Sequence, residues 1–131
     1  MIDPKELRIG NYVQFYRKME DQDPSQASIC SIFETDGDYY VKFEDGFCVN
    51  TERGIKPIFL SKELISKLGF RQESNTYFYG DIELSIGCND DSLYLTFNWN
   101  EYQISSTPIL YLHQLQNIYF DLTGKELMVN L

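Results

Sequence analysis

Two Asp-Gly pairs, spaced nine residues apart, constrain the fold of this 131-residue chain more than any other sequence feature. Asp36-Gly37 and Asp45-Gly46 each fit a two-residue hairpin turn, because glycine tolerates the positive φ that such turns require. Two of these turns in succession predict a three-stranded antiparallel meander that runs from Cys30 to Cys48.

The turns also predict which side chains share a face of the meander. The first turn pairs Thr35 with Asp38, and the second pairs Phe43 with Cys48. Since opposed residues point to the same side, one apolar face is expected to contain Cys30, Ile32, Tyr39, Val41, Phe43 and Cys48. Cys30 and Cys48 would then be core residues, roughly 9–10 Å apart and too distant for a disulfide.

Other patterns complete the set of expected elements. Residues 7–16 alternate like a strand that bends at Gly10-Asn11, and the polar residues 17–27 predict a loop. Residues 61–68 predict a helix with Ser61 as its N-cap and Gly69 after its end. Residues 76–86 and 93–104 predict antiparallel strands, with a turn near residues 98–100.

A final amphipathic helix is expected over residues 110–122. Its apolar face would contain Tyr111, Leu112, Leu115, Ile118, Tyr119 and Leu122. The opposite, outer face would carry His113, Gln116, Asn117 and Phe120, with Asp121 at the flank.

Together these elements predict an α+β protein. An N-terminal strand-rich sheet, SH3-like or a curled meander, leads into a connecting helix and then a second antiparallel sheet packed by the C-terminal helix. The division is either into lobes at 1–60 and 61–131 or into one compact domain. The likeness to SH3-like barrels is one of fold and implies no function.

Composition excludes several classes of protein. With 43% hydrophobic residues the chain can form a packed core. No apolar run is long enough to span a bilayer, and the N-terminus lacks the pattern of a secretory signal. Three cysteines without a CxxC pair fit reduced thiols, so a cytoplasmic location is expected.

The net charge of −9 is distributed unevenly. Residues 72–124 contain no Lys or Arg, but they hold Glu73, Asp81, Glu83, Asp90, Asp91, Glu101 and Asp121. Such a surface disfavours direct binding of nucleic acid or membranes. It is either a solubilising surface or one that meets a basic partner.

Motifs for catalysis, nucleotides or metals are missing from the sequence. GxxxxGK[ST], GxGxxG, GxSxG and HExxH do not occur, and no cofactor is expected. Asp90-Asp91 resembles a fragment of a calcium loop, but the residues that follow read as a strand. His113 is the sole histidine, so a Cys/His zinc site would have to draw on distant cysteines.

The best candidates for a functional surface are an exposed aromatic residue and the polar face of the last helix. Trp99 lies at a predicted turn, and tryptophan is enriched in interface hot spots. The candidate interaction surface therefore consists of Trp99, His113, Gln116, Asn117 and Asp121.

Three segments carry a resemblance that spans nearly the whole chain: LRIGNYV (7–13), PIFLSKELISKLGF (57–70) and YLHQLQNIYFDLTGKEL (111–127). In this order they are similar to segments of a recurrent family of small proteins from gut Bacteroidetes, their phages and mobile elements. The chain departs from that pattern at Tyr111-Leu112 and in the loop 17–27. The resemblance implies a bacterial cytoplasm and a mobile-element context, and it implies no catalytic or binding residues.

These observations favour a non-enzymatic interaction or regulatory module that binds a protein partner. A second hypothesis is an acidic mimic of nucleic acid that inhibits a DNA- or RNA-binding protein, with its carboxylates in a row on one face. A third is a small hydrolase that uses His113 or a pair of carboxylates. The partner and the oligomeric state are left open.

Overall fold

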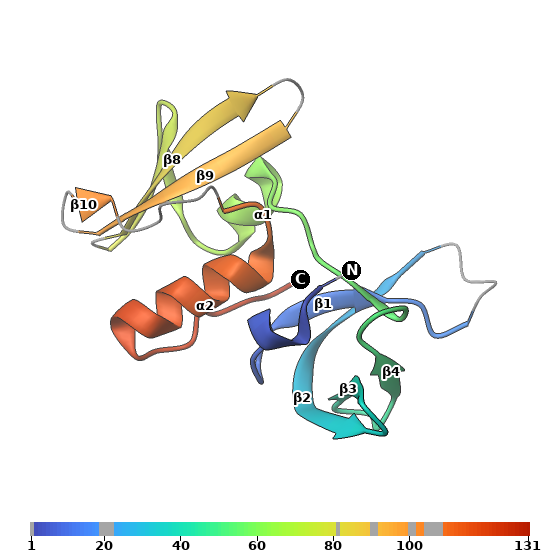
Figure 1. Cartoon of the computed structure of the whole chain (residues 1–131). Coiled ribbons are helices and arrows are strands. Elements are labelled where there is room, and N and C mark those ends of the chain that lie inside the picture. Colours follow the sequence, from blue (N-terminus) through green and yellow to red (C-terminus); the bar gives the residue numbers. More distant parts are fainter. Residues whose placement is uncertain (1, 19–22, 81, 90–91, 100–101, 104–108) are drawn as a thin grey trace. The chain divides into compact units, whose positions relative to one another are not determined.

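The strands that flank the two Asp-Gly turns belong to the first of two sheets in the computed structural model (Figure 1). The structure describes residues 2–18, 23–80, 82–89, 92–99, 102–103 and 109–131. It divides into two units, Met1–Ile58 with Leu112–Glu126 (unit 1) and Phe59–Tyr111 with Leu127–Leu131 (unit 2). The predicted α+β class is confirmed, with antiparallel sheets, a short helix and a C-terminal helix.

Unit 1 contains a five-stranded antiparallel sheet in the order β4-β3-β2-β1-β5. Its strands are β1 (Tyr12–Phe15), β2 (Ser25–Thr35), β3 (Asp38–Phe43), β4 (Cys48–Asn50) and β5 (Ile55–Lys56). The predicted meander is therefore present, and β5 returns to pair with β1. The described strands leave this sheet open, since β4 and β5 are its two edges and do not form a closed barrel.

Alternation along these strands produces most of the apolar core beneath this sheet, and Ile2 and Leu7 from the N-terminal segment complete it. The buried side chains are Ile2, Leu7, Val13, Phe15, Ile29, Val41, Phe43 and Ile55. Phe15 stacks on two other rings. Its ring centroid is 4.0 Å from that of Phe43 and 5.6 Å from that of Phe47. Stacked aromatic pairs of this kind add to the stabilisation that burial alone provides.

The N-terminal strand is shorter than predicted. A 3₁₀ turn, η1 (Pro4–Glu6), comes first, and β1 begins only at Tyr12. Gly10 has φ = +98°, and the Asn11 N–H donates to the Arg8 carbonyl, so residues 8–11 form a turn instead of a strand. As a result Leu7 is buried but Ile9 is exposed.

The prediction that Cys30 and Cys48 are core residues is wrong, since both thiols are exposed. The first turn has the predicted register, with Thr35 opposite Asp38 and Ile32 opposite Val41, but a bulge between Ile29 and Ser31 then brings Ile29 opposite Phe43. A bulge leaves one extra residue without a partner, and here that residue is Cys30.

Cys48 is displaced by the second turn. The Phe43 N–H donates to the Phe47 carbonyl, so three residues rather than two form the loop, and Cys48 pairs with Lys42 instead of Phe43. Because a shift of one residue moves a side chain to the other face of a strand, Cys48 leaves the core and Phe47 packs against it.

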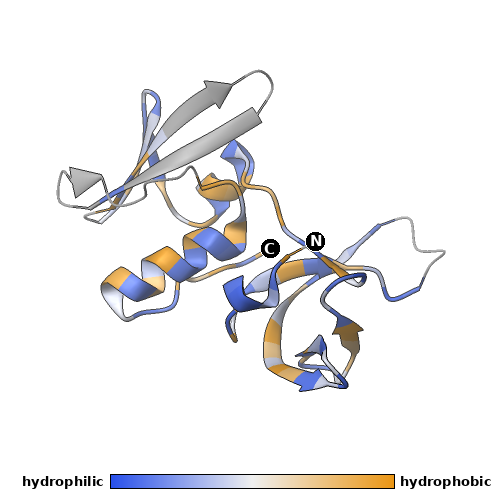
Figure 2. Cartoon of the chain, in the orientation of Figure 1, coloured by the Kyte–Doolittle hydropathy of each residue, from blue (hydrophilic) through white to orange (hydrophobic). Residues whose placement is uncertain are grey.

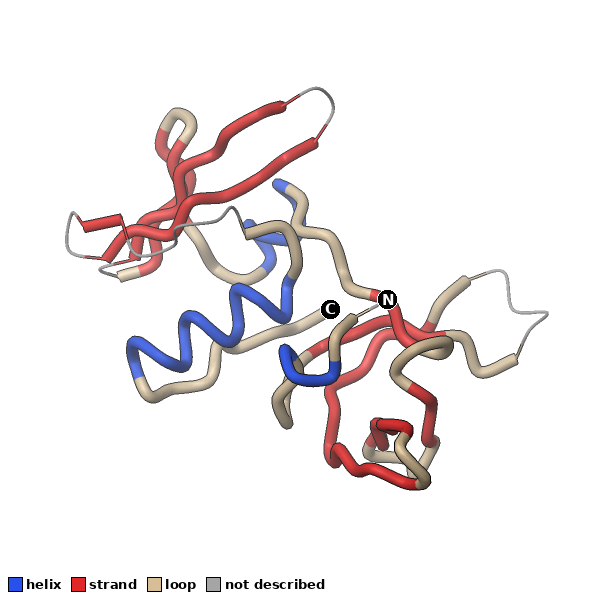
Figure 3. The backbone as a smooth tube through the Cα atoms, viewed as in Figure 1, coloured by secondary structure: helices blue, strands red, loops and turns tan. Residues whose placement is uncertain are grey.

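Unit 2 contains a second antiparallel sheet, in the order β10-β9-β8-β7-β6 (Figure 3). Its elements are α1 (Lys62–Lys67), β6 (Arg71–Glu73), β7 (Thr76–Tyr79), β8 (Ile82–Asn89), β9 (Ser92–Trp99) and β10 (Tyr102–Gln103). The helix has its predicted N-cap, because Ser61 Oγ accepts a hydrogen bond from the Leu64 N–H at 3.1 Å. Gly69 ends it with φ = +96°, as expected for a residue just past a helix.

The C-terminal helix α2 (Leu112–Thr123) is present as predicted but belongs to unit 1, with the N-terminal strands, and not with the second sheet. Apolar and polar residues alternate along it (Figure 2). Leu112, Leu115 and Tyr119 are buried, and so are His113 and Gln116. Among the described residues, no helix is long and apolar enough to cross a membrane.

The register around the two exposed thiols gives a direct test. With intact protein, iodoacetamide is expected to label Cys30 and Cys48 at rates within a few-fold of those in urea, because neither thiol has to be uncovered by unfolding. Peptide mass spectrometry measures each site separately. Protection of either cysteine by a large factor in the folded protein would contradict the observed bulge and the three-residue loop.

Candidate functional site

The polar side chains of α2 that the sequence assigns to an outer face are bonded to the N-terminal segment instead. Gln116 is 1% exposed. Its Oε1 accepts from the Tyr12 N–H at 2.8 Å, and its Nε2 donates to the Gly10 carbonyl at 3.0 Å. Both ends of one amide therefore replace the backbone partners that the chain lacks at the start of β1.

Asn117 continues this network towards Asn11. Its Oδ1 accepts from Asn11 Nδ2 at 2.8 Å, and its Nδ2 donates to the Glu6 carbonyl at 2.8 Å. Asn11 is itself buried, and its Oδ1 accepts from the Arg8 N–H at 2.7 Å. Buried amides are stable in such a place only when their donors and acceptors are paired.

Arg8 closes the network on its partly exposed side. Its guanidinium donates to Glu126 through Nη1 at 2.6 Å and Nη2 at 3.2 Å, and Nε donates to Asn117 Oδ1 at 3.2 Å. It also lies over the Phe120 ring, 4.4 Å from the centroid. We refer to Arg8, Asn11, Gln116, Asn117 and Glu126 as the clamp, since they join residues 6–12 to α2 and to the segment that follows it.

His113 lies beside the clamp and is 1% exposed, so the prediction that His113 and Gln116 face solvent is wrong. Its Nε2 is 3.7 Å from Oε2 of Glu6. Burial lowers the pKa of His113, because a low-dielectric site disfavours the imidazolium, and the Glu6 carboxylate opposes that shift. A side chain so enclosed has no access to a substrate in solution.

The other candidate residues belong to different units. Asp121 is exposed on α2 in unit 1, whereas Trp99 is the last residue of β9 in unit 2, where its backbone pairs with Ile82 and Tyr102. The Trp99 side chain lies outside what the structure describes. Sequence reasoning missed Arg8 and Asn11, although Gly10-Asn11 had indicated an interrupted strand.

Of the acidic residues that the mimic hypothesis requires in one row, Asp81, Asp90, Asp91 and Glu101 lie outside the described residues. Glu73 is paired with Arg71 at 3.2 Å, and Glu83 is half-buried. The calcium fragment at Asp90-Asp91 is likewise outside the described part. Within the described ranges, three or more His, Cys, Asp or Glu side chains do not gather in a way that could hold a metal ion.

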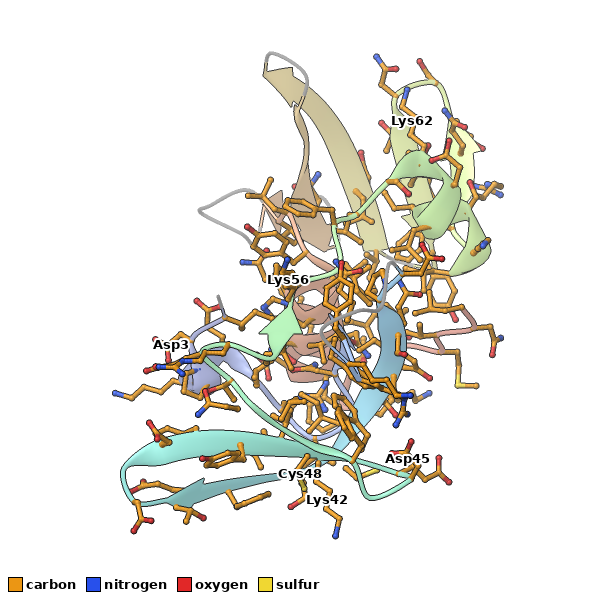
Figure 4. All side chains as sticks on the ribbon, turned by 90° about the vertical axis from the view of Figure 1, so that its right-hand side faces the viewer. Asp3, Lys42, Asp45, Cys48, Lys56 and Lys62 are labelled. Carbon is orange, nitrogen blue, oxygen red and sulfur yellow. The ribbon has the colours of Figure 1, made fainter. Side chains whose placement is uncertain are left out.

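A different feature of unit 1 is exposed and aromatic. Phe33 on β2 is cross-strand from Tyr40 on β3, and the two rings stack with centroids 5.6 Å apart and planes 15° from parallel. Phe33 is 37% exposed. From the register, the face with this ring pair carries Ser31, Phe33, Thr35, Asp38, Tyr40, Lys42, Cys48 and Asn50. We call it the outer face; Figure 4 shows Lys42 and Cys48 next to each other on it.

Another aromatic group in unit 1 is covered by an arginine. Arg17 lies over the Phe15 and Phe47 rings, 5.3 and 5.0 Å from their centroids, and forms an ion pair with Asp45. The Phe47 N–H donates to Asp45 Oδ1 at 3.1 Å. This hydrogen bond, and then the guanidinium, hold the pKa of Asp45 below its usual value.

Comparison of the chain with models of known families, with curated proteins and with solved structures finds no match.

The clamp makes a prediction about stability. Replacing Gln116 with leucine, which has a similar volume, leaves the Tyr12 N–H and the Gly10 carbonyl without their partner. An unmet buried group costs about 1–3 kcal/mol. Since these two groups are only partly buried, we expect the free energy of unfolding in urea to fall by about 2–4 kcal/mol. The matched control is Asp121→Asn on the exposed side of the same helix, with an expected change within about 0.5 kcal/mol. Equal effects of the two variants would contradict the clamp.

His113 makes a prediction about pH. Its pKa is lowered in the folded state, so as the pH falls below about 6.5 the unfolded chain takes up a proton that the folded chain does not. The free energy of unfolding should therefore decrease from pH 7.5 to pH 5.5, by at most about 1.4 kcal/mol per pH unit. Because His113 is the sole histidine, His113→Gln should flatten this dependence. Parallel curves for the two proteins would rule out a buried, neutral His113.

Proposed function

We propose that this protein is a non-enzymatic module that binds another protein through the outer face of unit 1. The observation that carries the proposal is the stacked pair of Phe33, which is exposed, and Tyr40, which is half-buried. Single exposed apolar side chains are common on protein surfaces, whereas aromatic residues held in a fixed arrangement are typical of binding hot spots.

The hairpin that presents the ring pair is well suited to binding because its backbone is preorganised. Asp36 and Gly37 have φ = +53° and +84°, as a type I′ turn requires. Val41 and Phe43 anchor β3 in the core from its inner side. Rings fixed in this way lose little conformational entropy when a partner covers them.

The hydrolase hypothesis loses its main candidate, since His113 is enclosed beside the clamp. For the carboxylate pair and for the nucleic-acid mimic, the described residues supply no favouring observation, and both stay predictions.

The remaining sequence predictions extend the proposal. Strands β1–β4 follow one another and β5 returns to β1, which supports an open relative of the SH3-like barrels. We also propose a bacterial cytoplasm as the site of action. Two of the segments behind the family resemblance, LRIGN (7–11) and HQLQN (113–117), supply most of the clamp, so related chains should share unit 1.

The proposal is tested by affinity capture with the full-length protein from a lysate of its source organism, followed by mass spectrometry. Wild type should retain a specific protein that Phe33→Ser loses. The matched control is Tyr16→Ser, because Tyr16 is also 37% exposed, and it follows β1, which pairs with the part of β2 away from the hairpin turn. Retention of the same proteins by wild type and Phe33→Ser, or capture of none at micromolar bait, would overturn the proposal.

A further inference from the structure

Three arginines of this chain share one arrangement, in which the guanidinium lies over an aromatic ring and pairs with a carboxylate. Arg8 lies over the Phe120 ring and pairs with Glu126. Arg17 uses Phe15, Phe47 and Asp45. Arg71 uses Phe78, 5.8 Å from the ring centroid, and Glu73 at 3.2 Å. A guanidinium is suited to both contacts at once, because it is planar, permanently charged and weakly hydrated.

The outer face also carries aromatic rings and a carboxylate, but it has no arginine. Asp38 is two residues before Tyr40 on β3, on the same side as the Phe33–Tyr40 pair. Asp45 stands in the same sequence relation to Phe47 in the Arg17 group. Within the described ranges, no cation is placed over Phe33 or Tyr40, and Asp38 takes part in no salt bridge.

Charge around the hairpin turn favours a cation at this end of the outer face. Glu34, Asp36 and Asp38 are all exposed within five residues, and residues 33–41 contain no Lys or Arg. The nearest cation on the same face is Lys42, which is four residues from Asp38 and therefore about 13 Å along the strand. That separation exceeds the Debye length of about 8 Å at physiological salt, so Lys42 does not neutralise Asp38.

We infer that the outer face binds an arginine side chain of the partner protein, which stacks on Phe33 and Tyr40 and pairs with Asp38. The inference rests on the proposed function and names the chemistry that the partner must present. A lysine would supply the charge but not the plane that lies against a ring. The partner's arginine would complete on the surface the arrangement that Arg17 completes within the same unit.

The test is an NMR titration of the full chain with three short acetylated peptide amides that are identical except for one central residue. The central residue is arginine, lysine or citrulline, which keeps the planar end group of arginine but has no charge. The arginine peptide should shift the backbone amide signals of residues 33–42. The lysine peptide should bind at least about threefold more weakly, and the citrulline peptide should not bind measurably.

Variants then locate the contact. Phe33→Ala and Asp38→Asn should each weaken binding of the arginine peptide by about fivefold. The control Asp23→Asn removes the same charge from another exposed position and should change the affinity by less than about twofold. Because the three substituted residues are all exposed, circular dichroism can confirm that each variant is folded.

The results that would overturn the inference are specific. Equal affinity for the arginine and lysine peptides would mean that charge alone is sensed. Shifts confined to residues outside 33–42, or equal effects of Asp38→Asn and Asp23→Asn, would place the contact elsewhere. If capture finds a partner that Phe33→Ser loses but the arginine peptide does not bind the outer face, the inference fails while the proposed function stands.

Discussion

The side-chain amide of Gln116 is the interaction on which unit 1 depends. It meets the Gly10 carbonyl and the Tyr12 N–H, just where the chain turns into β1. Ordinarily a neighbouring strand would satisfy those backbone groups, but β5, the neighbour of β1 opposite β2, pairs only with Gln14 and Phe15. The Gln116 side chain on the helix thus makes the hydrogen bonds that a further strand would otherwise make. Removing it would leave two partly buried backbone groups without partners.

The same bonds explain why the helix could be predicted while its environment could not. Leu112, Leu115 and Tyr119 have helical spacing and are buried, which the hydrophobic pattern indicates. That pattern assigns Gln116 and His113 to solvent because it weighs side chains by polarity alone. A buried amide is stable when both of its ends are paired, and here the pairs come from residues more than 100 positions away. Periodicity within one helix contains no information about such partners.

In the first sheet, too, a local sequence pattern predicts only part of the structure: the Asp-Gly turns fix the register near a turn but not further along the strands. Asp36-Gly37 fixes the register of β2 and β3 at the hairpin, and the prediction is correct as far as Ile32 and Val41. Asp45-Gly46 is the same dipeptide, but it lies in a three-residue loop, and Phe47 therefore packs against the core. Packing of a large aromatic ring there outweighs the preference for the shorter turn, and Cys48 moves outward. At the bulge, likewise, burial of Ile29 leaves Cys30 outside. In both places the larger apolar side chain takes the core position, and the thiol does not.

Most arginines of this acidic chain make the same two contacts, one with an aromatic ring and one with a carboxylate. Most of its cations are lysines, yet three of the four arginines lie over a ring and beside a carboxylate. An ion pair on the surface contributes little by itself, because water screens it and two long side chains lose freedom. A ring beneath the guanidinium restricts its motion by packing and adds attraction, so the carboxylate meets a cation that is already held. Phe33, Tyr40 and Asp38 provide the ring and the carboxylate on a rigid hairpin, so the entropy of holding them is already lost on folding. An arginine supplied by another protein, as we propose for the outer face, would lose only the conformational entropy of its own side chain.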